Sequence, residues 1–215
     1  MTQHVESQIE ATVRQQYNQL ATQYDRRWQQ YITNTLVFFK DWMQLAPSAI
    51  VLDIACGTGE LERLLLTQNP QQSITGVDIS DEMLRQAQQK LKSFPNIAFQ
   101  VATARSLPFQ SCQFDVVLSA NSFHYFDQPD TVLQEMQRVL KPNGKLLLLD
   151  WCRDSWVCQM CDWVLQWFDP AHKQCYTQAE LHTLLTSNQF QIVRSQKVRF
   201  GWLWELMVVE AIYLN

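Results

Sequence analysis

The sequence lacks any apolar stretch that approaches the roughly 20 residues needed to cross a lipid bilayer. Its start, MTQHVESQIEATVRQQ, is polar and has no apolar core of the kind found in secretory signals. Internal repeats and low-complexity segments are absent too. We therefore expect a cytoplasmic protein without stable membrane insertion, in which residues 1–215 fold as one domain.

An excess of basic residues is also missing. Lys and Arg number 17 against 21 Asp and Glu, the formal net charge is −4, and the cations are dispersed along the chain. A nucleic acid would therefore find no basic field to neutralise its phosphates. We do not expect nucleic acid as a partner.

A disulfide framework is not indicated either, because the six cysteines occur in a chain without a secretory signal. Cys158, Cys161, His172 and Cys175 are residue types that bind zinc. The local pattern nevertheless predicts a helix, whereas zinc ribbons of this spacing usually lie on Gly-rich turns. We expect no metal, although the sequence does not decide the point.

Helices and strands alternate regularly through much of the chain. Residues 1–46 are predicted to form an N-terminal helical arm, because apolar residues from Val5 to Leu45 recur at three- and four-residue steps. In the core, 47–150, strands are expected at 49–54, 73–77, 97–102, 114–119 and 145–150, with helices at 60–68, 80–91 and 129–140. This α/β pattern predicts a doubly wound, mostly parallel sheet with helices on both faces.

The remaining residues, 151–215, extend this core. The aromatic-rich segment from Trp151 to Tyr176 is predicted to be a helical lid inserted after strand five. A capping box, Thr177 to Glu180, predicts another helix, and Phe190 to Tyr213 predicts two more strands. The sheet should therefore have seven strands.

The first strand ends in a loop suited to a nucleoside. Glycines in Asp53 to Gly59 let the backbone approach a ligand, and Asp78 ends the next strand, where it can accept hydrogen bonds from ribose hydroxyls. A nicotinamide-dependent oxidoreductase is the competing interpretation, but its third glycine is replaced by Glu62. A P-loop is also excluded, because no Gly-Lys-Ser/Thr follows.

Four motifs in this order resemble those of the class I S-adenosylmethionine (SAM)-dependent methyltransferases with a Rossmann-like fold, the group that includes small-molecule enzymes of quinone and sterol biosynthesis. The resemblance covers most of the chain. The motifs are Val51–Gly59, Gly76–Ser80, Leu107–Phe109 with Phe114–Val117, and Glu135–Gly144.

The resemblance implies a set of cofactor contacts. The loop 53–59 would hold the methionine part of SAM, Asp78 the ribose, and Ile79 with Met83 one face of the adenine. The implied set is Tyr24, Asp53, Ala55, Cys56, Gly57, Gly59, Asp78, Ile79, Met83, Thr103, Ala104, Arg105 and Ser119. Tyr17 and Trp28 lie in the same arm as Tyr24, where either a site role or packing on the sheet is open.

Two residues depart from the pattern of this family. Ala55 replaces the usual glycine, which adds only a methyl group, and Thr103 replaces an aspartate that often helps to hold adenine. The second change removes a charge, so either SAM affinity is lower or Arg105 rearranges the pocket.

The catalytic prediction rests on the segment after strand four. Methyl transfer is an in-line displacement that mainly needs alignment, so a base matters only when the acceptor must lose a proton. His124 is placed to be that base, or it is a loop residue bonded to backbone, and Asn121 either orients the acceptor or caps the turn. An Asn/Asp-Pro-Pro-aromatic loop, expected in amino-methylating nucleic-acid enzymes, is absent here.

The acceptor pocket is predicted from aromatic residues: Phe123, Trp156, Trp163 and Trp167. The three tryptophans share one helical face, which either lines an apolar cavity or packs on the sheet. The first interpretation predicts a small apolar or aromatic acceptor.

A second class of function also fits the sequence. The protein could bind SAM without catalysing methyl transfer.

Overall fold

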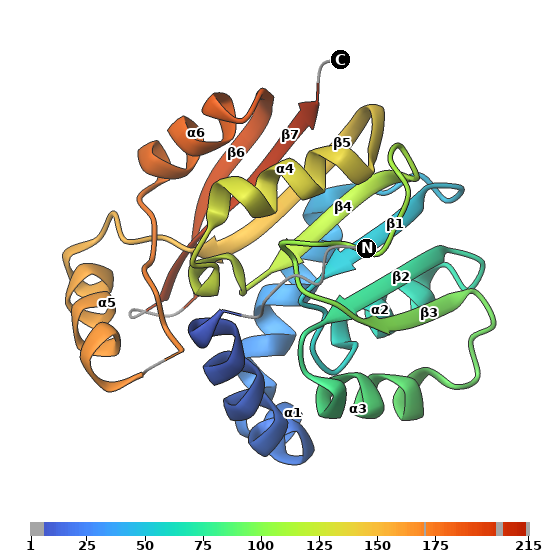
Figure 1. The fold of residues 1–215 in the computed structure, drawn as a ribbon, viewed down its shortest axis with the longest axis horizontal. Helices are drawn as coiled ribbons and strands as arrows, with labels where there is room; N and C mark the ends of the chain where they lie inside the picture. Colours follow the sequence, from blue (N-terminus) through green and yellow to red (C-terminus); the bar gives the residue numbers. More distant parts are fainter. Residues whose placement is uncertain (1–6, 170, 201–203, 214–215) are drawn as a thin grey trace.

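The computed structural model describes residues 7–169, 171–200 and 204–213. Its centre is a seven-stranded sheet in the order β3-β2-β1-β4-β5-β7-β6 (Figure 1). The strands are β1 (Ile50–Ile54), β2 (Ser73–Asp78), β3 (Ile97–Val101), β4 (Phe114–Ala120), β5 (Leu140–Trp151), β6 (Phe190–Phe200) and β7 (Trp204–Tyr213). The first five are parallel, whereas β7 runs antiparallel to both β5 and β6. The expected mostly parallel, seven-stranded α/β fold is confirmed.

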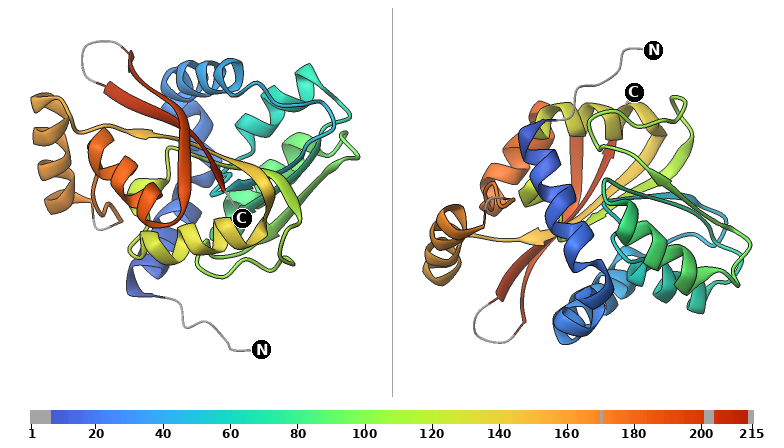
Figure 2. Two further views of the ribbon diagram at one scale, coloured as in Figure 1. Left: turned by 90° about the horizontal axis from the view of Figure 1, so that it is seen from above. Right: turned by 60° about the horizontal axis from the view of Figure 1, so that its bottom comes forward.

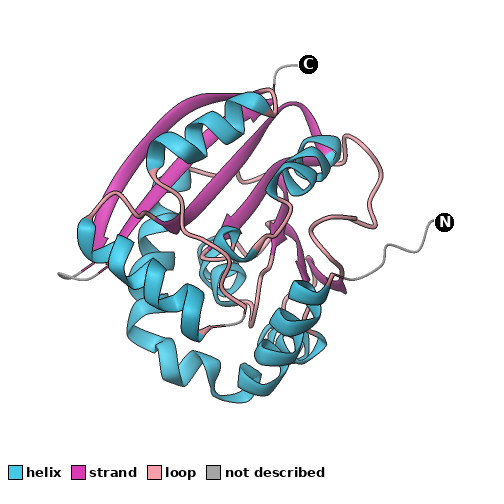
Figure 3. Cartoon of the chain, turned by 60° about the vertical axis from the view of Figure 1, so that its left-hand side comes forward, coloured by secondary structure: helices cyan, strands magenta, loops and turns pink. Residues whose placement is uncertain are grey.

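Helices cover both faces of the sheet, as Figures 1 and 3 show. They are α1 (Gln8–Met43), α2 (Glu60–Gln68), α3 (Asp81–Leu91), α4 (Pro129–Val139), α5 (Trp156–Phe168) and α6 (Gln178–Ser187), with a 3-10 turn at Phe123–Tyr125. Buried residues of α1, α2 and α3 form one apolar core with the strands, and those of α4 and α6 form another. Helix α5 contributes to neither core.

Side-chain caps explain where several helices begin. Ser80 accepts a hydrogen bond from the Met83 amide at the start of α3, as the sequence predicts for a good N-cap. Thr177 and Glu180 form the expected capping box of α6. Ser7 and Glu10 form a second capping box at α1, which begins at Gln8. The predicted start at Val5 lies outside the described residues.

Two stretches differ from the prediction. The segment 141–144, which lies between a predicted helix and a predicted strand, belongs to β5. This strand begins at Leu140 and shifts register between the pairs Phe114–Leu140 and Val116–Lys145. The segment 151–176 was predicted to be a helical lid, but among its described residues only α5 is helical. The residues from Ala171 to the start of α6 form a connection without helix. Within the described ranges, none of the helices is long and apolar enough to cross a membrane.

Candidate functional site

A cavity opens at the carboxyl ends of β1, β2 and β4, where α1 crosses in front of the sheet (Figure 2). It holds about 1090 Å³ of space, part of which is open to solvent. The lining includes ten of the thirteen predicted SAM contacts: Tyr24, Asp53, Ala55, Cys56, Gly57, Asp78, Ile79, Met83, Thr103 and Ala104. Gly59, Arg105 and Ser119 do not line it.

The glycines of the first loop have different structural roles. Gly57 has a φ of +56°, and a Cβ placed on it would meet no atom within 4 Å, so its backbone borders open space in the cavity. Gly59 has a φ of +77°, and its Cβ would lie 3.0 Å from the Cβ of Ala87. Gly59 therefore permits close packing of α2 against α3, while its role as a ligand contact stays a prediction.

Ala55 also needs a correction. Its φ is 60°, a left-handed conformation that costs an L-residue roughly 1–2 kcal/mol. The cost of replacing the usual glycine therefore arises in the backbone and not in the bulk of one methyl group. The loop keeps this conformation because its neighbours fix it: the Cys56 amide donates to the Val77 carbonyl, and the Gly57 amide donates to Asp78.

Asp78 joins two loops of the cavity, the one after β1 and the one before α3. Its Oδ2 accepts from the Gly57 amide at 2.8 Å, and its Oδ1 accepts from the Ser80 amide at 2.8 Å. Burial raises the pKa of this carboxyl group to about 6, although the backbone donors oppose the shift. Asp78 thus organises the loop after β1 and the start of α3, and it lines the cavity between them.

Two further acids lie behind the loop. Burial, followed by the charge of Asp78, raises the pKa of Asp53 to about 7, and burial raises the pKa of Glu62 well above its usual value. Glu62 is the residue that replaces the third glycine of the nicotinamide motif. It is fully buried in α2, where protonation removes the cost of burying its charge.

These shifts predict that the ligand-free protein loses stability as pH rises. Asp53 and Asp78 bind a proton more tightly when folded, so their contribution is complete below the unfolded pKa near 4 and is lost through pH 6 to 7. We expect the free energy of unfolding to fall by about 2–4 kcal/mol between about pH 5 and pH 8. Urea titrations at both pH values measure it, and Asp53→Asn should flatten the trend. A free energy that stays constant or rises would contradict the buried acidic cluster.

Helix α1 forms the front wall of the cavity. Tyr17 and Tyr24 line it with their rings 5.9 Å apart, whereas Trp28 is 39% exposed and lies outside the lining. Burial raises the pKa of both phenols, so they remain neutral. Asn18 accepts a hydrogen bond from the Ser80 hydroxyl, which ties the arm to the start of α3.

The predicted adenine end contains a carboxylate that the sequence reasoning missed. Glu10 lines the cavity, accepts from the Thr103 hydroxyl and pairs with Arg105, whose Nε lies 2.9 Å from Oε1. Arg105 therefore turns to Glu10 and does not line the cavity, while its contact with SAM stays a prediction. The Ser-x-x-Glu capping box signals Glu10 as a helix residue, but it does not indicate that the partners lie more than 90 positions away.

The end of β4 provides the opposite wall. Asn121 lines the cavity in a left-handed conformation, φ 55°, while its Oδ1 accepts from the Tyr31 hydroxyl at 2.8 Å. Ser119 is buried and bonds to the hydroxyl of Ser122, which reaches the lining in its place. Tyr125 and Phe126 complete this wall and were not predicted.

His124 lies one layer behind this wall. Its Nδ1 is 2.6 Å from Oδ1 of Asp150, and its amide donates to Oδ2 of the same carboxylate at 2.9 Å. The ring stacks on Trp151, with centroids 4.8 Å apart, and is only 2% exposed. His124 is thus bonded to a carboxylate rather than only to backbone, and it does not line the cavity. Asp150 was not predicted.

The predicted acceptor residues lie elsewhere. Trp156, Trp163 and Trp167 are 73%, 62% and 74% exposed, so they neither line the cavity nor pack on the sheet. Phe123 is buried against Phe126 and Tyr176. The helical spacing correctly predicts that the tryptophans share a face, but spacing alone does not determine what that face meets.

Of the four residues considered as zinc ligands, only His172 and Cys175 belong to a cluster of described residues that could hold a metal ion, and Asp162 joins them. Ligand atoms of Asp162, His172 and Cys175 lie within 4.8 Å of one another, and all three residues are buried. Asp162 Oδ1 is 2.7 Å from His172 Nε2 and accepts from the Cys175 amide at 2.7 Å. Cys158 and Cys161, which the sequence grouped with them, are not in this cluster of described residues. The cluster joins α5 to the connection that follows it.

Comparison with known proteins yields a consistent set of relatives. A family model described as a methyltransferase domain matches residues 51–144. The demethylmenaquinone methyltransferase of Thermotoga maritima is 42% identical over 100 residues, which cover 46% of this chain and 42% of the relative. An uncharacterized methyltransferase-like protein of Schizosaccharomyces pombe is 29% identical over 183 residues, covering 70% of each chain. The chain thus spans less than half of the first relative's length.

A solved structure shares the fold of this chain. A putative methyltransferase of Haloferax volcanii, solved in complex with a methyltransferase activator, superimposes with a TM-score of 0.83 at 18% sequence identity. The match covers 94% of this chain and 98% of that one. At this identity the likeness establishes the fold alone.

Proposed function

We propose that this chain is a class I SAM-dependent methyltransferase that transfers the methyl group of SAM to a small, largely apolar or aromatic acceptor. The observation that carries the proposal is the cavity, in which a glycine loop and Asp78 adjoin a wall of aromatic residues. Several relatives are named as quinone methyltransferases, which agrees with an aromatic acceptor.

The cofactor half of the cavity fits SAM by the chemistry of its lining. The Gly57 backbone borders open space, Asp78 offers a carboxylate to ribose hydroxyls, and Ile79 with Met83 offers apolar contact to adenine. Bound SAM would supply an electrophilic methyl group on its sulfonium. What the protein adds is alignment and exclusion of water.

The acceptor half is formed by rings. Tyr17, Tyr24, Tyr125 and Phe126 line the cavity, and Ile32 and Leu36 of α1 add apolar surface. Neutral phenols and apolar side chains would desolvate a flat acceptor, while aromatic faces also suit a cationic sulfonium. A highly charged acceptor would find few partners here, because the acids of the lining lie in the cofactor half or pair with cations.

We assign His124 and Asp150 a positioning role in this reaction. Asp150 holds the turn that bears Asn121, Ser122 and Tyr125, since its carboxylate accepts from the His124 amide, the His124 ring and the Trp151 amide. Asp150→Ala should lower the free energy of unfolding by about 2–4 kcal/mol, because buried donors lose their acceptor. SAM affinity should change little.

Chemical denaturation and calorimetric titration of the same variant separate the two roles. Asp115→Ala, at a half-exposed acid of β4, is the control and should cost far less stability. If Asp150→Ala kept its stability while turnover fell about a hundredfold, His124 would act as a general base and the positioning role would be wrong.

The function itself is tested with a panel of acceptors. Purified protein and SAM are incubated with small phenols and naphthoquinols, and in parallel with charged amines and carboxylates, and S-adenosylhomocysteine is quantified by mass spectrometry. Product in the aromatic set alone supports the proposed acceptor class. Turnover confined to charged acceptors would refute that class while leaving SAM-dependent transfer intact.

A further inference from the structure

Helix α5 has its apolar and polar faces reversed. An amphipathic surface helix usually buries its apolar stripe and exposes charge. Here the one charged residue within the helix, Asp162, is 3% exposed, whereas the exposed side chains are mostly aromatic or apolar. The exposed large ones are Trp156, Met160, Trp163, Val164, Trp167 and Phe168.

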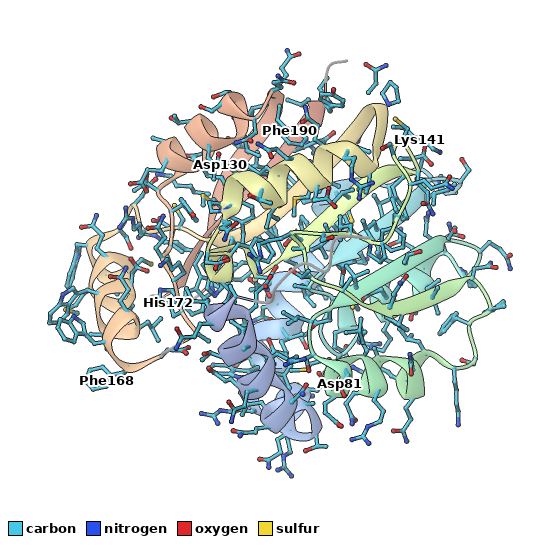
Figure 4. The ribbon with its side chains drawn as sticks, viewed as in Figure 1. Asp81, Asp130, Lys141, Phe168, His172 and Phe190 are labelled. Carbon is cyan, nitrogen blue, oxygen red and sulfur yellow. The ribbon has the colours of Figure 1, made fainter. Side chains whose placement is uncertain are left out.

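Buried polar contacts fix this orientation. Asp162 accepts from the Cys175 amide and contacts His172 Nε2, each at 2.7 Å, and Arg153 Nη1 lies 3.7 Å from its Oδ2. Figure 4 shows His172 between α5 and the body of the protein, while Phe168 projects at the outer edge. Because several partners hold Asp162 inward, the aromatic face is held outward in the described structure.

This aromatic face has no partner among the described residues. Trp163 and Trp167 contact each other, with ring centroids 6.4 Å apart, and Phe168 is 82% exposed. Contiguous exposed aromatic surface of this kind marks an interaction site. The remaining question is which partner fits it.

The size of the face argues against a second copy of the chain. A helix of 13 residues is about 20 Å long at 1.5 Å per residue and about 10 Å wide, so one face covers a few hundred Å² at most. A stable protein interface buries about 800 Å² on each partner. A lipid surface has no such minimum area, because individual aromatic side chains insert into it.

We propose that α5 docks on a lipid surface, lying in the interface with its tryptophans and Phe168 among the headgroups. Tryptophan suits that zone, since its ring is apolar and its N–H is polar. A helix without outward charge and with bulky aromatics matches an interfacial segment that lies on the membrane without spanning it. Lys173, exposed just after the helix, adds a cation at that edge.

Docking at α5 also places the lipid close to the candidate site. The amides of Lys173 and Gln174, in the connection after α5, both donate to the His124 carbonyl at 3.2 Å. Tyr125, the next residue, lines the cavity. A membrane-dissolved apolar molecule would therefore have a short path to the aromatic wall.

The test is sedimentation with vesicles, in the absence of SAM and acceptor. Two vesicle types are used, phosphatidylcholine alone and phosphatidylcholine mixed with phosphatidylglycerol. The full chain should bind both. A combined Trp163→Gln, Trp167→Gln and Phe168→Gln variant should partition at least about tenfold more weakly, because three aromatic side chains no longer leave water.

Trp28→Gln is the matched control, because Trp28 is an exposed tryptophan that belongs to α1 and not to α5. It should change partitioning by less than about twofold, and both variants should keep the melting temperature of the parent. The proposal is overturned if the parent fails to bind either vesicle or if the triple variant binds as well as the parent. It is equally overturned if light scattering shows a dimer that the triple variant abolishes. None of these results bears on methyl transfer, since neither substrate is present.

Discussion

Asp78→Ala should weaken SAM binding by about 1.5–3 kcal/mol, which is roughly ten- to 150-fold in affinity. The variant removes a charged acceptor for the ribose hydroxyls. It also releases the amides of Gly57 and Ser80, so the loop after β1 loses its link to α3. Isothermal titration calorimetry on the folded variant measures the effect directly.

Asp41→Ala is the control for this experiment, since Asp41 is an exposed acid at the far end of α1 that pairs only at the surface with Lys40. It should leave SAM affinity unchanged. If folded Asp78→Ala bound SAM as tightly as the parent, Asp78 would not belong to the site, and the assignment of the cofactor half would lose its main support.

Gly57→Val should abolish measurable SAM binding. A Cβ on Gly57 would meet no protein atom within 4 Å. The added side chain would therefore extend into the cofactor half of the cavity. A β-branched residue at a φ of +56° also strains the loop, which should lower the free energy of unfolding by about 1–2 kcal/mol. Calorimetry and urea denaturation measure the two effects separately.

Gly59→Ala provides the contrast, because a Cβ there lies 3.0 Å from Ala87 and 3.1 Å from Leu91 of α3. This variant should lose stability, while the affinity that remains in the folded fraction should be near that of the parent. A Gly57→Val protein that still bound SAM normally would show that the loop does not approach the cofactor.

Local signals in the sequence predicted much of the fold. The strand at 50–54 was recognisable as a continuous apolar run, and Ser80 and Thr177 marked helix starts, because capping depends on residues only three positions apart. The glycine loop and Asp78 were likewise predictable, since the carboxyl ends of parallel strands meet at one edge of the sheet.

Contacts between distant parts of the chain were not predictable in this way. Glu10 of α1 meets Thr103 and Arg105, which follow β3, although more than 90 residues separate them. His124 meets Asp150 because β4 and β5 are neighbours in the sheet. The environment of the aromatic face of α5 was not predictable for a different reason. Periodicity identifies residues that share a face, but only the burial of Asp162 reveals that the face points outward.

Turnover with SAM labelled by deuterium in its methyl group tests the central claim most directly. The purified protein is incubated with the labelled cofactor and a metabolite extract, and S-adenosylhomocysteine and labelled products are identified by mass spectrometry, with Asp78→Ala as the reference. We predict S-adenosylhomocysteine together with at least one small molecule that carries the labelled methyl group, both strongly reduced in the variant. If the protein binds SAM but forms no more S-adenosylhomocysteine than the variant does, it binds SAM without methyl transfer, and the proposed function is wrong.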